Sequence, residues 1–193
     1  MDSKIFNLLK PLTDYIDSGR FFRQPFQWLY YLIGVLCVLS PLAFLYTLIE
    51  SKVFRYADGG EIFAIILIWL IFGVVCVFGG LLWISRGKKL KELLPENSKF
   101  VALPCIANFI QTSGEFTGLF IGIIGFIGGV IGTIFGVGGH LPIVPATIPT
   151  SILSVIFGYL TIVFTRYVAE MVLAIASIAN NTEAIAKKKE KSE

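Results

Sequence analysis

Four long apolar runs restrict what this chain can fold into. Three of them, at about residues 28–49, 62–84 and 116–137, contain no charge, and a fourth extends over about residues 151–173. Roughly 20 helical residues are needed to cross a hydrocarbon core about 30 Å thick. Only 15% of the residues are charged, whereas about a quarter are charged in a typical soluble chain. We therefore expect an all-α membrane protein, a bundle of four transmembrane helices with a glycine-rich third helix.

The basic residues indicate how these helices are oriented. If the four runs alternate across the membrane, 14 of the 16 Lys and Arg residues lie on one side, and only Lys52 and Arg55 lie on the other. Because cytoplasmic segments are enriched in Lys and Arg, both termini and the second loop are expected in the cytoplasm. The chain then divides into a cytoplasmic interfacial arm (1–25), a transmembrane domain (26–179) and a charged cytoplasmic tail (180–193).

Glycines recur along the third run at alternating spacings of four and three residues. We call this set the glycine seam: Gly118, Gly122, Gly125, Gly129, Gly132 and Gly136. Glycine costs about 1 kcal/mol relative to alanine in a water-exposed helix. In lipid, however, the backbone must satisfy its own hydrogen bonds, and a stripe without side chains lets a second helix come close. The seam therefore predicts a packing surface, toward another helix of the chain or toward another subunit.

The fourth run carries a matching stripe of small residues. Ser154, Gly158, Thr161 and Thr165 follow the same spacing as the glycines. Two adjacent antiparallel helices with matching small stripes are natural packing partners, and hydroxyl groups can bond across such contacts for about 0.6 kcal/mol each. We therefore expect the third and fourth helices to be tightly paired.

Three charged residues lie in or beside these two helices. If the stripes pack together, Glu115, Arg166 and Glu170 meet near the cytoplasmic boundary. Charges within membranes are rare and are functional suspects. The cluster is a candidate ion pair that locks the two helices, or a candidate gate. We favour the lock, because an ion pathway usually has a carboxylate near the midplane and this register of the fourth span places none there. A register centred on Arg166–Glu170, which the apolar run at 168–179 allows, would reverse this preference.

Other positions predict local features of the helices. Pro41, in the first run, is expected to kink its helix, and Pro104 to open a short helix, 105–111, that lies on the membrane. Apolar residues at spacings of three and four predict that the fourth helix continues into the cytoplasm and pairs with a copy of itself or a partner; they are Val168, Met171, Ile175, Ile178 and Ile185, with Thr182 among them.

The sequence offers no catalytic motif. Cys37, Cys76 and Cys105 are not placed for a disulfide or a metal cluster, and the single histidine, His140, has no carboxylate nearby. We therefore expect no enzyme activity, no metal and no cofactor. The net charge of +3 suits anionic lipid headgroups and not a nucleic acid, because the basic residues lie beside the predicted spans.

Two segments of the second half carry a resemblance. The run FIQTSGE at 109–115, and IVFTRYVAE at 162–170 leading to ANNT at 179–182, resemble small four-span inner-membrane proteins of bacteria that lack an assigned function. This resemblance implies a location in the bacterial inner membrane.

These features together lead to a functional expectation. We expect a non-enzymatic membrane protein that acts as an oligomerising or structural subunit through glycine-lined helix packing, in contact with the bilayer and with copies of itself or a larger membrane complex. The alternative is a small ion channel or transporter in which Glu115, Arg166 and Glu170 form a gate on the cytoplasmic side.

Overall fold

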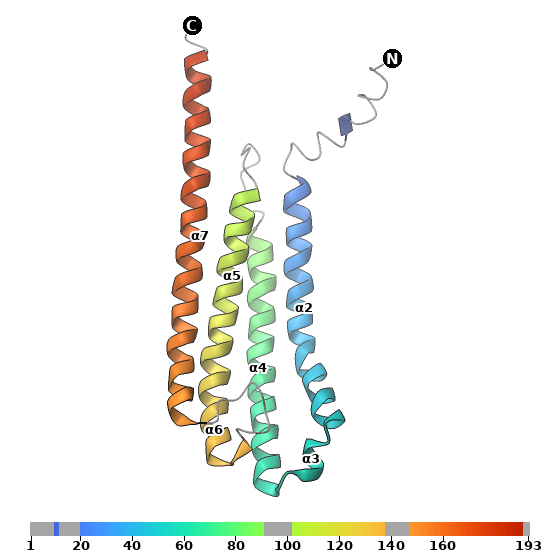
Figure 1. Ribbon diagram of the computed structural model, residues 1–193. Helices are drawn as coiled ribbons and strands as arrows, with labels where there is room; N and C mark the ends of the chain where they lie inside the picture. Colours follow the sequence, from blue (N-terminus) through green and yellow to red (C-terminus); the bar gives the residue numbers. More distant parts are fainter. Residues whose placement is uncertain (1–9, 12–19, 91–101, 138–146, 191–193) are drawn as a thin grey trace.

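The structure is a computed structural model that describes residues 10–11, 20–90, 102–137 and 147–190. Within these ranges the ordered elements are helices (Figure 1). They are α2 (Arg20–Glu50), α3 (Val53–Tyr56), α4 (Gly59–Lys89), α5 (Ala102–Ile123), the π-helical turn η1 (Ile124–Gly128), α6 (Gly129–Ile134) and α7 (Ile148–Glu190). Most of the predicted interfacial arm lies outside the described residues.

Four helical stretches are long and apolar enough to cross a membrane. They are Gln24–Glu50, Gly59–Lys89, Ala102–Ile134 and Ile148–Thr182. Each overlaps one of the four apolar runs in the sequence. The predicted all-α architecture with four membrane-spanning helices is therefore confirmed, and the chain is a multi-pass membrane protein.

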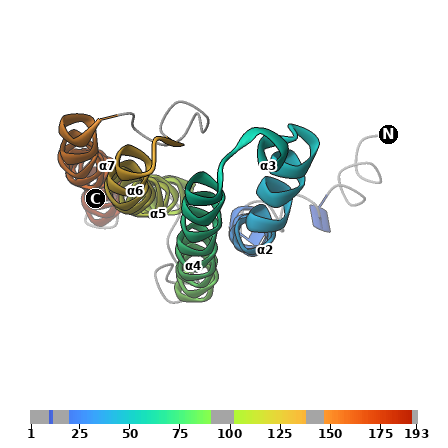
Figure 2. The ribbon, with the colours of Figure 1, turned by 90° about the horizontal axis from the view of Figure 1, so that it is seen from below.

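The four long helices stand in an open row in the order α2, α4, α5 and α7 (Figure 2). The most extensive contacts lie within two hairpins, α2 with α4 and α5 with α7. Contacts between the hairpins are less extensive, and open grooves remain on both sides of α4. The N-terminal end of α2 and the C-terminal end of α7 point in the same direction, toward the top of Figure 1. At that end α7 extends beyond α4 (Figure 1).

The first hairpin is close-packed at a pair of glycines. A methyl group on Gly80 would lie 2.8 Å from the carbonyl oxygen of Gly34, and one on Gly34 would lie 3.0 Å from the carbonyl oxygen of Gly80. Ordinary contacts of such a carbon are 3.4–4 Å. The backbones of α2 and α4 therefore approach here because neither residue has a side chain.

Pro41 lies inside α2, which changes direction in its last third (Figure 1). Proline has no N–H to donate to the carbonyl oxygen of Cys37, four residues earlier. The hydroxyl of Ser40 donates to that oxygen instead, at 2.7 Å. The Trp69 indole of α4 donates to the Pro41 carbonyl at 2.9 Å. The bend is thus stabilised by bonds that replace the missing backbone contact.

The third long helix differs from the prediction at its beginning. It starts at Ala102, so residues 105–111 form the first turns of α5 and not a separate helix lying on the membrane. Pro104 is tolerated because the first turn of a helix needs no backbone N–H bond. The helical run continues through η1 and α6, and Gly136 follows it with a φ of +75°, a conformation that favours glycine.

Candidate functional site

The glycine seam of α5 packs against α7 of the same chain. A methyl group on Gly118 would lie 2.5 Å from the carbonyl oxygen of Gly158 and 2.5 Å from the Ile162 side chain. A methyl group on Gly158 would meet the backbone carbonyl oxygen of Gly118 and would lie 2.9 Å from the backbone nitrogen of Gly122. The two helices therefore cross with their backbones in contact, at a point where three glycines meet.

The same pairing continues in both directions from this crossing. Toward η1, a methyl group on Gly125 would lie 2.5 Å from Cβ of Ser154, and toward the start of α5, one on Gly114 would overlap the Thr165 side chain. Gly114 precedes the predicted seam and extends it by one turn.

The other members of the seam have different surroundings. A methyl group on Gly122 would meet nothing within 4 Å, so only its backbone takes part in the crossing. Gly129 and Gly132 are buried in α6, and Gly136 lies beyond its end. The seam is therefore a contact surface in its first half, and its last glycine belongs to the turn that ends the helix.

The hydroxyl groups of the α7 stripe bond within their own helix. Ser154 donates to the carbonyl of Ser151 at 2.6 Å, Thr161 to that of Phe157 at 2.8 Å, and Thr165 to that of Thr161 at 2.8 Å. The expected bonds across to the neighbouring helix are not formed by these three groups. A carbonyl three or four residues earlier is always within reach of such a hydroxyl, whereas a partner helix must supply an acceptor at the right place.

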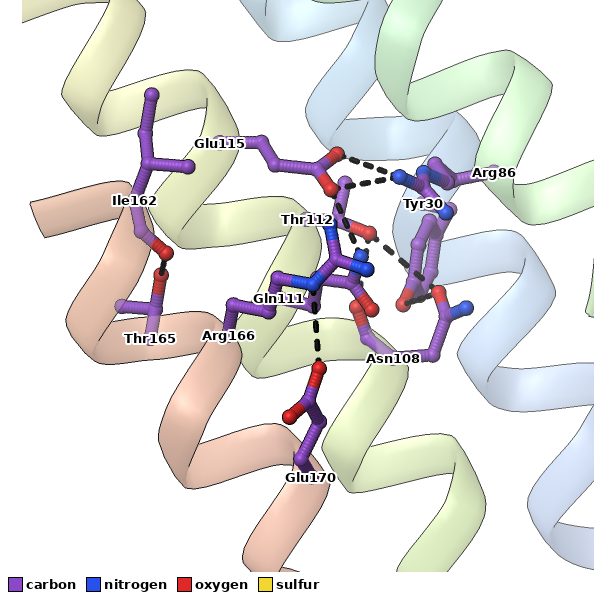
Figure 3. A network of polar contacts seen from close by, with 10 residues as sticks. All are labelled: Tyr30, Arg86, Asn108, Gln111, Thr112, Glu115, Ile162, Thr165, Arg166 and Glu170. Atoms are coloured by element: carbon purple, nitrogen blue, oxygen red, sulfur yellow. Dashed lines mark hydrogen bonds and ion pairs between the residues drawn. The ribbon is translucent and has the colours of Figure 1, made fainter. Parts of the chain in front are cut away.

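The predicted charge cluster is divided between two ion pairs (Figure 3). Glu115 accepts from Nη2 of Arg86 on α4, at 2.6 and 2.7 Å, and from Nε2 of Gln111 at 2.8 Å. Arg166 pairs with Glu170 one turn along α7, at 3.2 Å. The expectation that Glu115, Arg166 and Glu170 form one cluster therefore differs from the structure, in which the partner of Glu115 is Arg86, in the last turn of α4.

The two ion pairs differ in their exposure. The side chains of Arg86 and Glu115 are 29% and 21% exposed, whereas those of Arg166 and Glu170 are 66% and 65% exposed. An exposed pair of this kind contributes about 0–1 kcal/mol, but removing one partner of a buried pair costs about 3–5 kcal/mol. The Arg86–Glu115 pair lies between these cases and is the one that joins the two hairpins.

A second polar contact joins the hairpins one layer further along. The hydroxyl of Tyr30 on α2 donates to Oδ1 of Asn108 on α5 at 2.7 Å. The Thr112 hydroxyl donates to the backbone carbonyl of Asn108 at 2.8 Å. Tyr30 and Thr112 are fully buried. We call these contacts, together with the Arg86–Glu115–Gln111 group, the interhairpin cluster (Figure 3).

Aromatic rings surround this polar contact. The Tyr30 ring lies 5.1 Å from that of Trp83 on α4 and 5.9 Å from that of Phe109 on α5, in edge-to-face arrangements. The Trp83 Nε1 is buried and has no acceptor among the described residues. Three helices therefore meet around Tyr30, and their relative positions are set by ring packing and one buried hydrogen bond.

Most of the interhairpin cluster was missed by sequence reasoning. Sequence reasoning assigned Tyr30, Arg86, Asn108 and Thr112 no part in such a contact. A signal was present, because polar residues at 108, 111, 112 and 115 recur at helical spacing in an otherwise apolar segment. Interpreting 105–111 as a separate helix hid this continuity.

The interhairpin cluster joins helices through hydrogen bonds, an ion pair and ring contacts. Among the described residues, no group of three or more His, Cys, Asp or Glu side chains could hold a metal ion. Cys37, Cys76 and Cys105 are buried and form no disulfide. His140 lies outside the described residues. Comparison of the chain with protein-family models, with curated proteins and with solved structures found no match.

Proposed function

We propose that this multi-pass membrane protein is a non-enzymatic structural subunit that assembles with a second copy of itself through the C-terminal part of α7. The glycine seam, expected as the assembly surface, is covered by α7 within the chain. It therefore serves as the internal joint of the second hairpin. The assembly surface in this proposal is the face of α7 that points away from α5.

The charged residues define a level along the helices that fits a membrane boundary. Because Gly114 packs on Thr165, the adjacent Arg166 lies level with Glu115 and its partner Arg86. At 1.5 Å per residue, α4 runs about 37 Å from Glu61 to Arg86. Charges at this separation frame a hydrocarbon core of about 30 Å, crossed by a tilted helix.

The observation that carries the proposal is how far α7 continues beyond this level. From Arg166 to Glu190 the helix extends about 36 Å further. The α7 seam, defined as the residues Val168, Met171, Ile175, Ile178, Thr182 and Ile185, follows a three-four spacing on this extension. Of these, Ile178 is 66% and Ile185 is 69% exposed, while Ala169 and Ala176 on another face are buried.

An apolar stripe of this kind favours pairing with an identical helix. Alternating spacings of three and four are the heptad pattern of a two-stranded coiled coil, and exposed isoleucines on a helix outside the hydrocarbon core gain from being covered. The membrane anchor restricts both copies to one plane, which raises their effective concentration and lets a short coiled coil suffice.

The side of the membrane follows from the basic residues. The clusters that end α4 and α7 support a cytoplasmic position for both termini, and the resemblance noted above supports the bacterial inner membrane. The alternative of a gated channel gains no support from geometry. Glu115 is engaged by Arg86, Arg166 and Glu170 pair on an exposed face of α7, and the groove between α4 and α5 is lined by apolar residues and glycine.

Site-specific photocrosslinking in native membranes tests the proposal. A benzoylphenylalanine residue is placed at Ile178, on the α7 seam, or at Leu173, which is exposed on the opposite face of the same helix. We expect a crosslinked dimer with the probe at Ile178 and little or none at Leu173, together with a dimer mass in nanodiscs. A monomer mass without crosslinking, or equal crosslinking at both positions, would refute assembly through the α7 seam.

A further inference from the structure

An apolar groove of about 630 Å³ lies between α4 and α5, where the two hairpins meet. Each residue that lines it is apolar or glycine. The lining includes Leu70, Val74 and Phe78 from α4 and Leu119, Ile123 and Ile127 from α5. The volume is within the range of about 300–1,000 Å³ found for small-molecule sites.

The groove has a defined extent along the membrane normal. On α4 its lining runs from Leu70 to Leu82, which is about 18 Å of helix. The midpoint of α4 lies near Val74, so most of the groove is in the half that ends at Lys89. It therefore has about the depth of one leaflet of a core about 30 Å thick.

Basic side chains lie beyond one end of this groove. Arg86 follows Leu82 by one turn, and Lys89 follows Arg86 on the same face of α4. Arg86 contacts Glu115, the residue before the groove-lining Phe116. Lys89 is exposed, and its side chain forms no hydrogen bond or ion pair with another of the described residues. The apolar groove, about one leaflet deep, thus ends next to basic side chains at the depth of the lipid headgroups.

We infer that this groove holds an acyl chain of an anionic phospholipid from the leaflet that borders Lys89, with the phosphate at Lys89 and Arg86. An anionic phospholipid matches this arrangement, because its acyl chain is apolar and about one leaflet long and its phosphate lies at the end of that chain. Because Arg86 is already engaged by Glu115, Lys89 is the principal contact of the phosphate.

The extent of the groove along α4 favours a lipid over a second protein chain as the occupant. A transmembrane helix in the groove would extend through both leaflets, whereas the groove is confined mainly to one. The inference is independent of assembly through the α7 seam, which lies on another helix.

The test measures how much phospholipid stays bound to the detergent-purified protein by native mass spectrometry. The probes are dioleoyl phosphatidylglycerol, which is anionic, and dioleoyl phosphatidylcholine, which is not. Leu119→Trp fills the groove at a residue that is 48% exposed, and Leu81→Trp, at a residue 56% exposed on α4 outside the groove, is its control. Lys89→Gln removes the basic group, with Lys52→Gln at the other end of α4's hairpin as its control.

We expect wild-type protein to retain phosphatidylglycerol at least about fivefold better than phosphatidylcholine, the effect of one basic residue at an anionic surface. Lys89→Gln should abolish that preference, Leu119→Trp should lower retention of both lipids, and the two controls should match wild type. Equal retention of the two lipids by wild type, or unchanged retention in Leu119→Trp, would overturn the inference. A change of oligomer mass in Leu119→Trp without loss of lipid would instead identify the groove as a subunit interface and also overturn it.

Discussion

Replacing Gly158 with alanine would place a methyl group inside the crossing of α5 and α7. That methyl group would meet the carbonyl oxygen of Gly118, and it would lie 2.9 Å from the nitrogen and 3.0 Å from Cα of Gly122. All three are backbone atoms, which cannot rotate away as a side chain can. The helices must therefore separate at this point.

The size of the effect follows from the distances. Ordinary contacts of a methyl carbon begin at about 3.4 Å, so the two backbones must move apart by roughly 0.5–1 Å, a gap that forfeits a quarter to a half of each dispersion contact along the crossing. Overpacking of this kind typically costs about 1–3 kcal/mol. Since 1.4 kcal/mol is a tenfold change, we expect the unfolding equilibrium constant of Gly158→Ala to rise by about 5- to 150-fold.

The measurement is unfolding of the purified protein in mixed micelles with increasing SDS, followed by tryptophan fluorescence and circular dichroism. Gly122→Ala is the matched control, because a methyl group there would meet nothing within 4 Å. Its stability should equal that of wild type or exceed it slightly, since alanine is the better helix former. If Gly158→Ala and Gly122→Ala have the same stability, the close crossing is not what holds these helices together.

Two further predictions concern the interhairpin cluster. Arg86→Gln should lower the free energy of unfolding by about 1–3 kcal/mol, because it leaves the partly buried Glu115 carboxylate without its charged partner, whereas Arg166→Gln, which breaks an exposed pair, should change it by less than about 0.5 kcal/mol. SDS titration compares the two, and equal losses would contradict the assignment of Arg86 as the joining residue. Tyr30→Phe should cost about 1–3 kcal/mol, because Oδ1 of the buried Asn108 loses its 2.7 Å hydrogen bond and keeps only a 3.4 Å contact with the Thr112 hydroxyl. Hydrogen exchange should then increase at the start of α5, and no change there would argue against the Tyr30 bond as a link between hairpins.

The helices of this protein were predictable from composition and periodicity. A run of about 20 apolar residues has one favourable structure in lipid, because every backbone group must bond within its own segment. The same reasoning identified the spacing that brings Gly118 against Gly158. It did not identify the start of α5 at Ala102, because Pro104 and the polar residues after it are compatible with either a separate helix or a continuous one.

The partners of individual side chains depended on the tertiary structure. Glu115 accepts a hydrogen bond from Gln111, one turn earlier, but its charged partner is Arg86 and not Arg166, which lies at the same level. Arg86 is available because α4 stands next to α5 on the side away from α7. Glycine spacing likewise left open whether the seam faced the same chain or another subunit. Only the position of α7 decided it.

The sequence by itself determined how many helices cross the membrane and which stripes on the third and fourth are small enough for close approach. Those properties follow from local hydrogen bonding and side-chain volume, which each segment carries alone. The open row of helices, the interhairpin cluster and the groove beside it were decided by tertiary structure. They depend on which helix faces come together, and in lipid the apolar faces of these helices are nearly equivalent, so a few polar contacts and glycines select among them.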